Sequence, residues 1–209
     1  MSLHRQQILA RYYDPIAAAS LREHVVLRHM LASIGTAPER ILHLGCGRGW
    51  LTQALARHYP ACEVVGLDAD ADVLAGASEL ARTSATPLTF VLGTAEVAPV
   101  RGRFDAIVSS LLFHHLTRDA KRAAFTRAAE LLVPTGRMLV GDFGRPQDAV
   151  MRAAFIGVQL AHGFDDTADN LDGRYLELMS EANLVAPREV GRWRSWLGSV
   201  ALYQAQAPL

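Results

Sequence analysis

Short apolar runs alternate with longer amphipathic stretches along most of the chain. Five runs have the length and apolar content of buried parallel strands, and they cover about residues 40–44, 62–67, 88–92, 104–109 and 137–141. Other stretches repeat apolar residues at helical spacing, over about 16–34, 50–59, 70–83, 118–132, 147–162 and 171–182. Pro60 ends one helix, Asp70 caps the next, and Pro134-Thr135-Gly136 forms a turn.

The last 25 residues have a different pattern. Two strand-like runs, about 186–193 and 199–205, are joined by a short turn through Trp196-Leu197-Gly198, which predicts an antiparallel hairpin at one edge of the sheet. Strands that alternate with helices imply right-handed crossovers and a parallel sheet covered on both faces. The chain is therefore predicted to be an α/β protein with a seven-stranded, mostly parallel sheet.

The glycine-rich loop that follows the first strand is the strongest chemical signal. In Gly45-Cys46-Gly47-Arg48-Gly49 the glycines let the backbone turn sharply and let a ligand approach the main chain. A helix that starts near Trp50 points its free N–H groups into the same space. Asp68 ends the next strand, 23 residues after Gly45, where an acid can accept hydrogen bonds from a ribose diol. These features predict a small ligand that carries adenosine.

Composition narrows the class of protein. The chain has 209 residues, half of them hydrophobic and a fifth charged, with a formal net charge of zero. The length predicts one domain, and the zero net charge disfavours a nucleic-acid partner. We expect a monomer or homodimer with a small-molecule substrate. The sequence holds no apolar run of the roughly 18 residues that a membrane span needs, and no signal-like start. Its two cysteines, Cys46 and Cys62, lack metal-binding spacing, so a reducing cytoplasm is expected.

Five motifs in order resemble the class I S-adenosylmethionine-dependent methyltransferases, closest to the small-molecule branch of ubiquinone/menaquinone type. They are Leu44 to Gly49, Val65 to Asp68, Gly93 to Glu96, Phe104 to Leu116 and Leu131 to Leu139. The resemblance covers about residues 10–206. It implies a Rossmann-like fold and a single methyltransferase domain over 1–209. Within it, residues 1–35 form an N-terminal helical cap, and residues 145–182 form a helical insertion on the substrate side.

The resemblance also assigns cofactor contacts. Gly45, Cys46 and Gly47 are expected against the methionine part of the cofactor. Asp68 is expected to hold both ribose hydroxyls, with Ala69 beside the adenine.

Further cofactor contacts follow from the later motifs. Thr94 and Ala95 flank the adenine, Ser110 touches the methionine end, and Tyr13 lies in a segment that closes over the cofactor. The family usually has an acid at the position of His43. Because an imidazolium there repels the cationic cofactor, we expect weaker cofactor binding below the pKa of His43.

Methyl transfer needs a base only if the acceptor must lose a proton. His114 and His115 follow the fourth strand, at the edge where open parallel sheets bind ligands, and are the candidate bases. Asp142 ends the fifth strand, where it can contact substrate or cap the next helix. The segment Ser109 to Leu112 offers no strand-end carboxylate for a metal, so we expect no metal cofactor.

Two other functions stay open. A nicotinamide-dependent oxidoreductase would need a glycine where the chain has Trp50. A non-catalytic S-adenosylmethionine-binding regulator or partner protein would keep the pocket and lack an acceptor site. For an enzyme, we expect a small, partly apolar metabolite with an oxygen, carbon or nitrogen acceptor. The aromatic residues Trp193, Trp196 and Tyr203 are expected to pack in the core or at the sheet edge.

Overall fold

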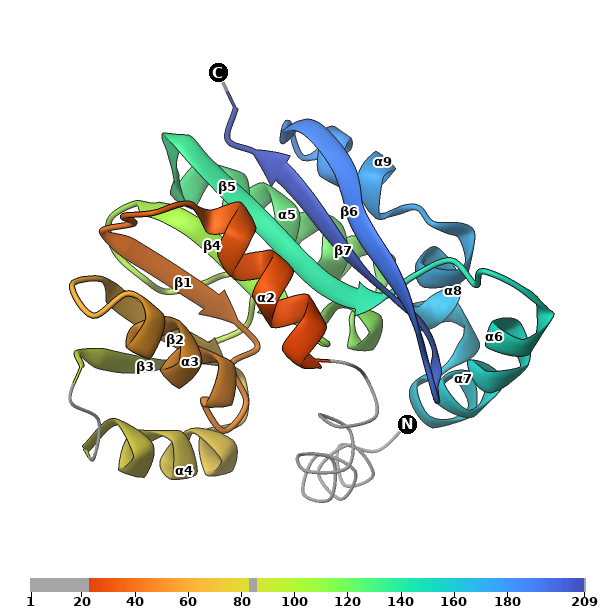
Figure 1. The fold of residues 1–209 in the computed structure, drawn as a ribbon, viewed down its shortest axis with the longest axis horizontal. Coiled ribbons are helices and arrows are strands. Elements are labelled where there is room, and N and C mark those ends of the chain that lie inside the picture. The colour runs from red at the N-terminus through yellow and green to blue at the C-terminus, as the bar shows by residue number, and fades with distance from the viewer. Residues whose placement is uncertain (1–22, 83–85, 209) are drawn as a thin grey trace.

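A computed structural model describes residues 23–82 and 86–208. Its seven strands form one sheet in the order β3-β2-β1-β4-β5-β7-β6 (Figure 1). The strands are β1 (Arg40–Leu44), β2 (Glu63–Asp68), β3 (Leu88–Leu92), β4 (Phe104–Ser110), β5 (Leu132–Phe143), β6 (Val185–Ser195) and β7 (Gly198–Gln206). The first five are parallel, whereas β7 pairs antiparallel with both β5 and β6. The predicted fold, including its terminal hairpin, is confirmed.

The helices fill the connections between strands. They are α2 (Glu23–Ile34), α3 (Trp50–His58), α4 (Ala71–Arg82), α5 (Arg118–Leu131), α6 (Ala149–Ala154), α7 (Ile156–His162), α8 (Phe164–Asp172) and α9 (Tyr175–Glu181). A single 3₁₀ turn, η1 (Phe113–His115), follows β4. The start of the helix predicted from residue 16, and Tyr13, lie outside the described residues. None of the described helices is long and apolar enough to cross a membrane.

Two hydrophobic cores lie on opposite faces of the sheet, because successive residues of a strand point to opposite sides. On one face, Ile41 of β1 packs in a buried cluster with Met30 of α2 and Leu55 of α3. On the other face, Leu42 packs in a cluster that includes Phe125 of α5 and Met179 of α9. The near-continuous apolar strands are thus explained by burial on both sides.

The region after β5 departs most from the sequence prediction. The helix predicted over 147–162 is split into α6 and α7 at Phe155, whose side chain is buried in the core. Helix α8 was not predicted, since its polar sequence has little apolar periodicity. It begins after Gly163, whose φ of 102° reorients the chain. Trp196 is 86% exposed at the hairpin tip, so its predicted packing role is wrong.

Candidate active site

The sheet register places the carboxyl ends of four strands in line. Leu44, the last residue of β1, pairs with Leu67 of β2 and with Ser109 of β4. Asp68 in turn pairs with Leu92, the last residue of β3. The segments that follow β1 to β4 therefore meet at one edge of the sheet, where the sequence places the cofactor residues.

The loop after β1 has a backbone that only glycine adopts readily. Gly45 and Gly47 have φ values of 68° and 53°, in the left-handed region. A Cβ on Gly45 would lie 2.9 Å from the side chain of Leu112, so the segment after β4 packs directly on this loop. A Cβ on Gly47 would meet nothing within 4 Å. The loop thus leaves open space against bare backbone at Gly47, as a bound cofactor requires.

Cys46 lies between these glycines and is nearly fully buried, against Leu74 and Ala77 of α4. Its N–H donates to Leu67 O over 2.9 Å, which ties the loop to β2. Burial raises the pKa of the Cys46 thiol, so the side chain stays a neutral packing group.

Asp68 connects the loop to the second strand. Its Oδ2 accepts from Gly47 N at 2.8 Å, and its Oδ1 accepts from Asp70 N at 3.0 Å. The carboxyl group is only partly buried, and each oxygen keeps a further acceptor position. These acceptor positions fit an adenosyl ribose, whose two hydroxyl groups can both donate to one carboxylate.

The remaining predicted cofactor residues lie at the same edge. Ala69 and Thr94 are exposed, Ala95 is buried, and Ser110 is partly buried at the end of β4. Gly93 N donates to Asp68 O at 2.9 Å, which fixes the Thr94 loop beside the end of β2. Their individual contacts with a cofactor stay predictions.

His43 is turned toward a helix. Its Nδ1 lies 2.9 Å from Thr52 Oγ1 of α3, the ring is buried, and Nε2 has no partner. Burial lowers the pKa of His43 to about 3. The ring is therefore neutral at physiological pH, and the pH effect on cofactor affinity proposed from sequence would fall below the range of ordinary assays.

His114 and Asp142 form a buried pair where β4 and β5 end. His114 Nδ1 donates to Asp142 Oδ1 at 2.8 Å, and the backbone N–H of His114 donates to Oδ2 at 3.1 Å. Both side chains are fully buried. The pairing leaves His114 Nε2 as the second ring nitrogen, and it has no hydrogen-bond partner among residues 23–82 and 86–208. A carboxylate that orients a histidine in this way sets its tautomer.

Two further histidine rings pack against this pair. The His115 ring lies 4.0 Å from that of His114, and the His162 ring, from the end of α7, lies 5.0 Å from His114 and 4.3 Å from His115. Burial, and then the nearby His114, lowers the pKa of His162 to about 4, against the opposing charge of Asp142. His162 is therefore neutral near pH 7.

Comparison with known proteins points to the same kind of domain as the five motifs. Residues 41–136 match the family model of a methyltransferase domain. The chain is similar there to methyltransferases. It is 30% identical over 107 residues to malonyl-[acyl-carrier protein] O-methyltransferase of Anoxybacillus flavithermus, covering 51% of this chain and 40% of that one. It is 28% identical over 168 residues to ubiquinone biosynthesis O-methyltransferase of Rhodopseudomonas palustris, covering 74% and 65%.

The methyltransferase fold is also shared with a solved structure, the YcgJ protein from Bacillus subtilis. That structure matches with a TM-score of 0.74 at 20% identity, over 89% of this chain and 99% of the other. The chain spans less than two thirds of the length of the two curated relatives that it matches.

The structure adds two site features that the sequence does not indicate. Asp142, for which the sequence offers a substrate contact or a helix cap, also holds His114. The adjacency of β4 and β5 carries this signal, since Ser110 pairs with Gly141 and so brings the two strand ends together. His162 has no signal of its own, because nothing in a helical stretch indicates that its last residue folds back on η1.

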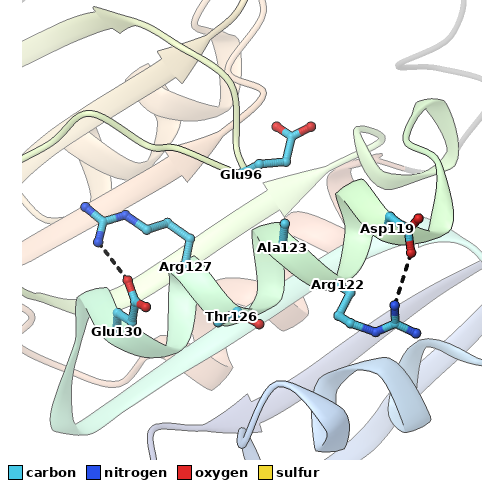
Figure 2. Close-up of a pocket in the computed structure, with 7 residues that line it drawn as sticks. All are labelled: Glu96, Asp119, Arg122, Ala123, Thr126, Arg127 and Glu130. Atoms are coloured by element: carbon cyan, nitrogen blue, oxygen red, sulfur yellow. Dashed lines mark hydrogen bonds and ion pairs between the residues drawn. The ribbon is translucent and has the colours of Figure 1, made fainter.

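A hollow lies between α5 and the loop that follows β3. It is lined by Glu96, Asp119, Arg122, Ala123, Thr126, Arg127 and Glu130 (Figure 2). Arg122 pairs with Asp119, and Arg127 pairs with Glu130, so these charges on the helix are paired locally.

Proposed function

We propose that this protein transfers a methyl group from S-adenosylmethionine to a hydroxyl oxygen of a small, partly apolar metabolite. The observation that carries the proposal is the His114–Asp142 pair, buried where β4 and β5 end, with His114 Nε2 unpartnered among the described residues. The match to a methyltransferase domain favours methyl transfer over nicotinamide-dependent redox chemistry.

The residues at the sheet edge fit the proposed cofactor. Gly45 and Gly47 would take its methionine part, and Asp68 its ribose. When bound, S-adenosylmethionine supplies a methyl group on a sulfonium, which is already an activated leaving group. The protein then has to orient the acceptor, exclude water and remove a proton where the acceptor carries one.

The His114–Asp142 pair selects among acceptor chemistries. A carboxylic acid, with a pKa near ~4, is already ionised at pH 7, whereas a phenol-like hydroxyl, with a pKa near ~10, is not. His114 Nε2 accepts the hydroxyl proton while Asp142 holds Nδ1–H and stabilises the resulting imidazolium. A base in this position serves a hydroxyl acceptor and is unnecessary for a carboxylate.

The acceptor itself would lie against the segment after β5. Helices α6 to α9 provide this side, with α7 and α9 also contributing Val158 and Met179 to the two hydrophobic cores. We further propose a cytoplasmic protein that acts on a small molecule without nucleic acid, consistent with the buried free thiols of Cys46 and Cys62 and the zero net charge.

Methyl transfer can be tested with S-adenosylmethionine that carries an isotope-labelled methyl group. Purified protein is incubated with a panel of phenols, aliphatic alcohols and carboxylic acids, and products are detected by mass spectrometry. We expect labelled methyl ethers from hydroxyl acceptors. Asp68→Ala should lose cofactor binding in calorimetry, with Asp72→Ala, an exposed acid on α4, as its control. Tight cofactor binding with no transfer to any acceptor would favour the non-catalytic regulator instead.

A further inference from the structure

The three histidines beside Asp142 have the composition of a transition-metal site. His114, His115 and His162 each offer a ring nitrogen, and these three nitrogens all lie within 4.8 Å of one another. Zinc takes imidazole nitrogens at about 2.0–2.1 Å, so its ligand atoms lie about 3.3 Å apart in a tetrahedron. The three nitrogens are therefore close to the spacing that one ion requires, and binding would draw them closer together.

The two ring nitrogens of His114 have the two roles found in metal-binding histidines. Metal-binding histidines usually donate their second ring N–H to a carboxylate, which fixes the tautomer and orients the ring. Asp142 Oδ1 holds His114 Nδ1 in this way at 2.8 Å. The other nitrogen, Nε2, is buried and has no partner, which is costly unless something binds there.

The other two ligands come from different parts of the fold. His115 is adjacent on η1 and is exposed. His162 is partly exposed at the end of α7. Three imidazoles match the protein ligand sets of zinc sites whose fourth position is taken by water or a small ligand.

We propose that His114, His115 and His162 bind one divalent transition-metal ion of the zinc type through their ring nitrogens. The sequence predicts no metal, because its cysteines lack metal-binding spacing and no carboxylate directly follows β4. His162 joins the cluster only because the end of α7 packs against η1 in the folded chain.

Such an ion would change the chemistry of the site. It would occupy His114 Nε2, the same lone pair that takes the acceptor proton, so the metal-loaded protein has no free base at this position. This consequence rests on the proposed function. The metal site itself does not, because binding requires neither cofactor nor acceptor.

Metal binding can be measured on the purified full chain after treatment with a chelator. Zinc is titrated by calorimetry, and cobalt is titrated while visible absorption reports a site of four or five ligands. We expect one equivalent per chain for each metal and no binding of magnesium, which prefers oxygen ligands. Absence of zinc and cobalt binding by the unaltered protein would overturn the proposal.

Substitutions locate the ion. His162→Gln and His115→Gln should each lower zinc affinity by at least about 100-fold, beyond the roughly 10–100-fold typical of outer-shell partners. His58→Gln is the matched control, since His58 is an exposed histidine at the C-terminal end of α3. This variant should bind zinc as the unaltered protein does. Circular dichroism checks that each variant is folded. Undiminished binding by the double variant H115Q/H162Q would also overturn the proposal.

Discussion

Two parts of the site are built in different ways. The cofactor edge comprises the ends of β1 to β3, and the acceptor edge comprises the ends of β4 and β5 with η1. At the cofactor edge the backbone makes the site: Gly45 and Gly47 take left-handed conformations, and Asp68 is held by main-chain N–H groups. At the acceptor edge, buried side chains make the site. The His114–Asp142 pair joins η1 to β5. Helix α8 is held in place by its own polar contacts.

The polar contacts of α8 explain how a short, polar helix stays in place. Asp169 is buried and pairs with Arg118 at 2.5 Å and with Lys121 at 3.2 Å, both from α5. Asn170 Nδ2 donates to Phe143 O at 2.8 Å and to Tyr175 Oη at 2.9 Å. One edge thus depends on backbone conformation and the other on buried charges and hydrogen bonds, so substitutions should affect the two edges separately.

The largest effect is expected at His114. His114→Gln keeps an N–H donor for Asp142 and removes the base, so turnover of a hydroxyl acceptor should fall by about 10²–10⁴-fold. Cofactor affinity should stay unchanged, because the substitution leaves the glycine loop and Asp68 intact. Steady-state kinetics and calorimetry measure the two quantities. Full turnover by His114→Gln would remove the base from the mechanism and leave positioning alone.

The next effect tests the anchoring of α8. Lys121 is fully buried, and Lys121→Met leaves Asp169 with Arg118 as its remaining charged partner. Breaking a buried ion pair costs about 3–5 kcal/mol, and we expect the lower end of that range in urea unfolding. Arg122→Met on the same helix is the control, since its exposed pairs should contribute at most about 1 kcal/mol. Equal losses in the two variants would contradict the anchoring role.

A smaller effect tests the backbone character of the cofactor edge. Gly47→Ala forces a side chain into the left-handed region, at about 1–2 kcal/mol of stability, and puts its Cβ into the open cradle. Cofactor affinity should therefore fall in addition. Gly35→Ala is a matched control, because Gly35 also has positive φ and open space around its Cβ. It should lose similar stability and keep its affinity for the cofactor in calorimetry.

The difference between the two edges also explains what could be predicted. The cofactor edge is encoded in contiguous motifs, since Gly45, Gly47 and Asp68 belong to one strand–helix–strand unit, and periodicity places all seven strands. The acceptor edge depends on contacts between distant segments. His162 ends a predicted helix that the structure breaks at Phe155, and Asp169 lies in α8, which apolar spacing does not predict because Gly163 and buried ion pairs determine it.

The smallest expected effect is the contribution of His43 to the pH dependence of stability. Burial lowers its pKa to about 3, whereas the unfolded chain protonates His43 near its ordinary value of 6.5. The unfolded state therefore binds one proton more than the folded state between these values. Its contribution to stability is present above pH 6.5 and is lost as pH falls toward 3, by about 1 kcal/mol between pH 7 and 5.5.

His43→Asn isolates this contribution, because asparagine can still bond to Thr52 and does not titrate. Urea unfolding at pH 7 and at pH 5.5 should show a smaller acid loss in the variant than in the unaltered protein, by about that 1 kcal/mol. Cofactor affinity measured over the same interval should show no contribution from His43, since the folded ring stays neutral throughout. An equal acid loss in both proteins would mean that His43 is not the buried neutral ring that its burial implies.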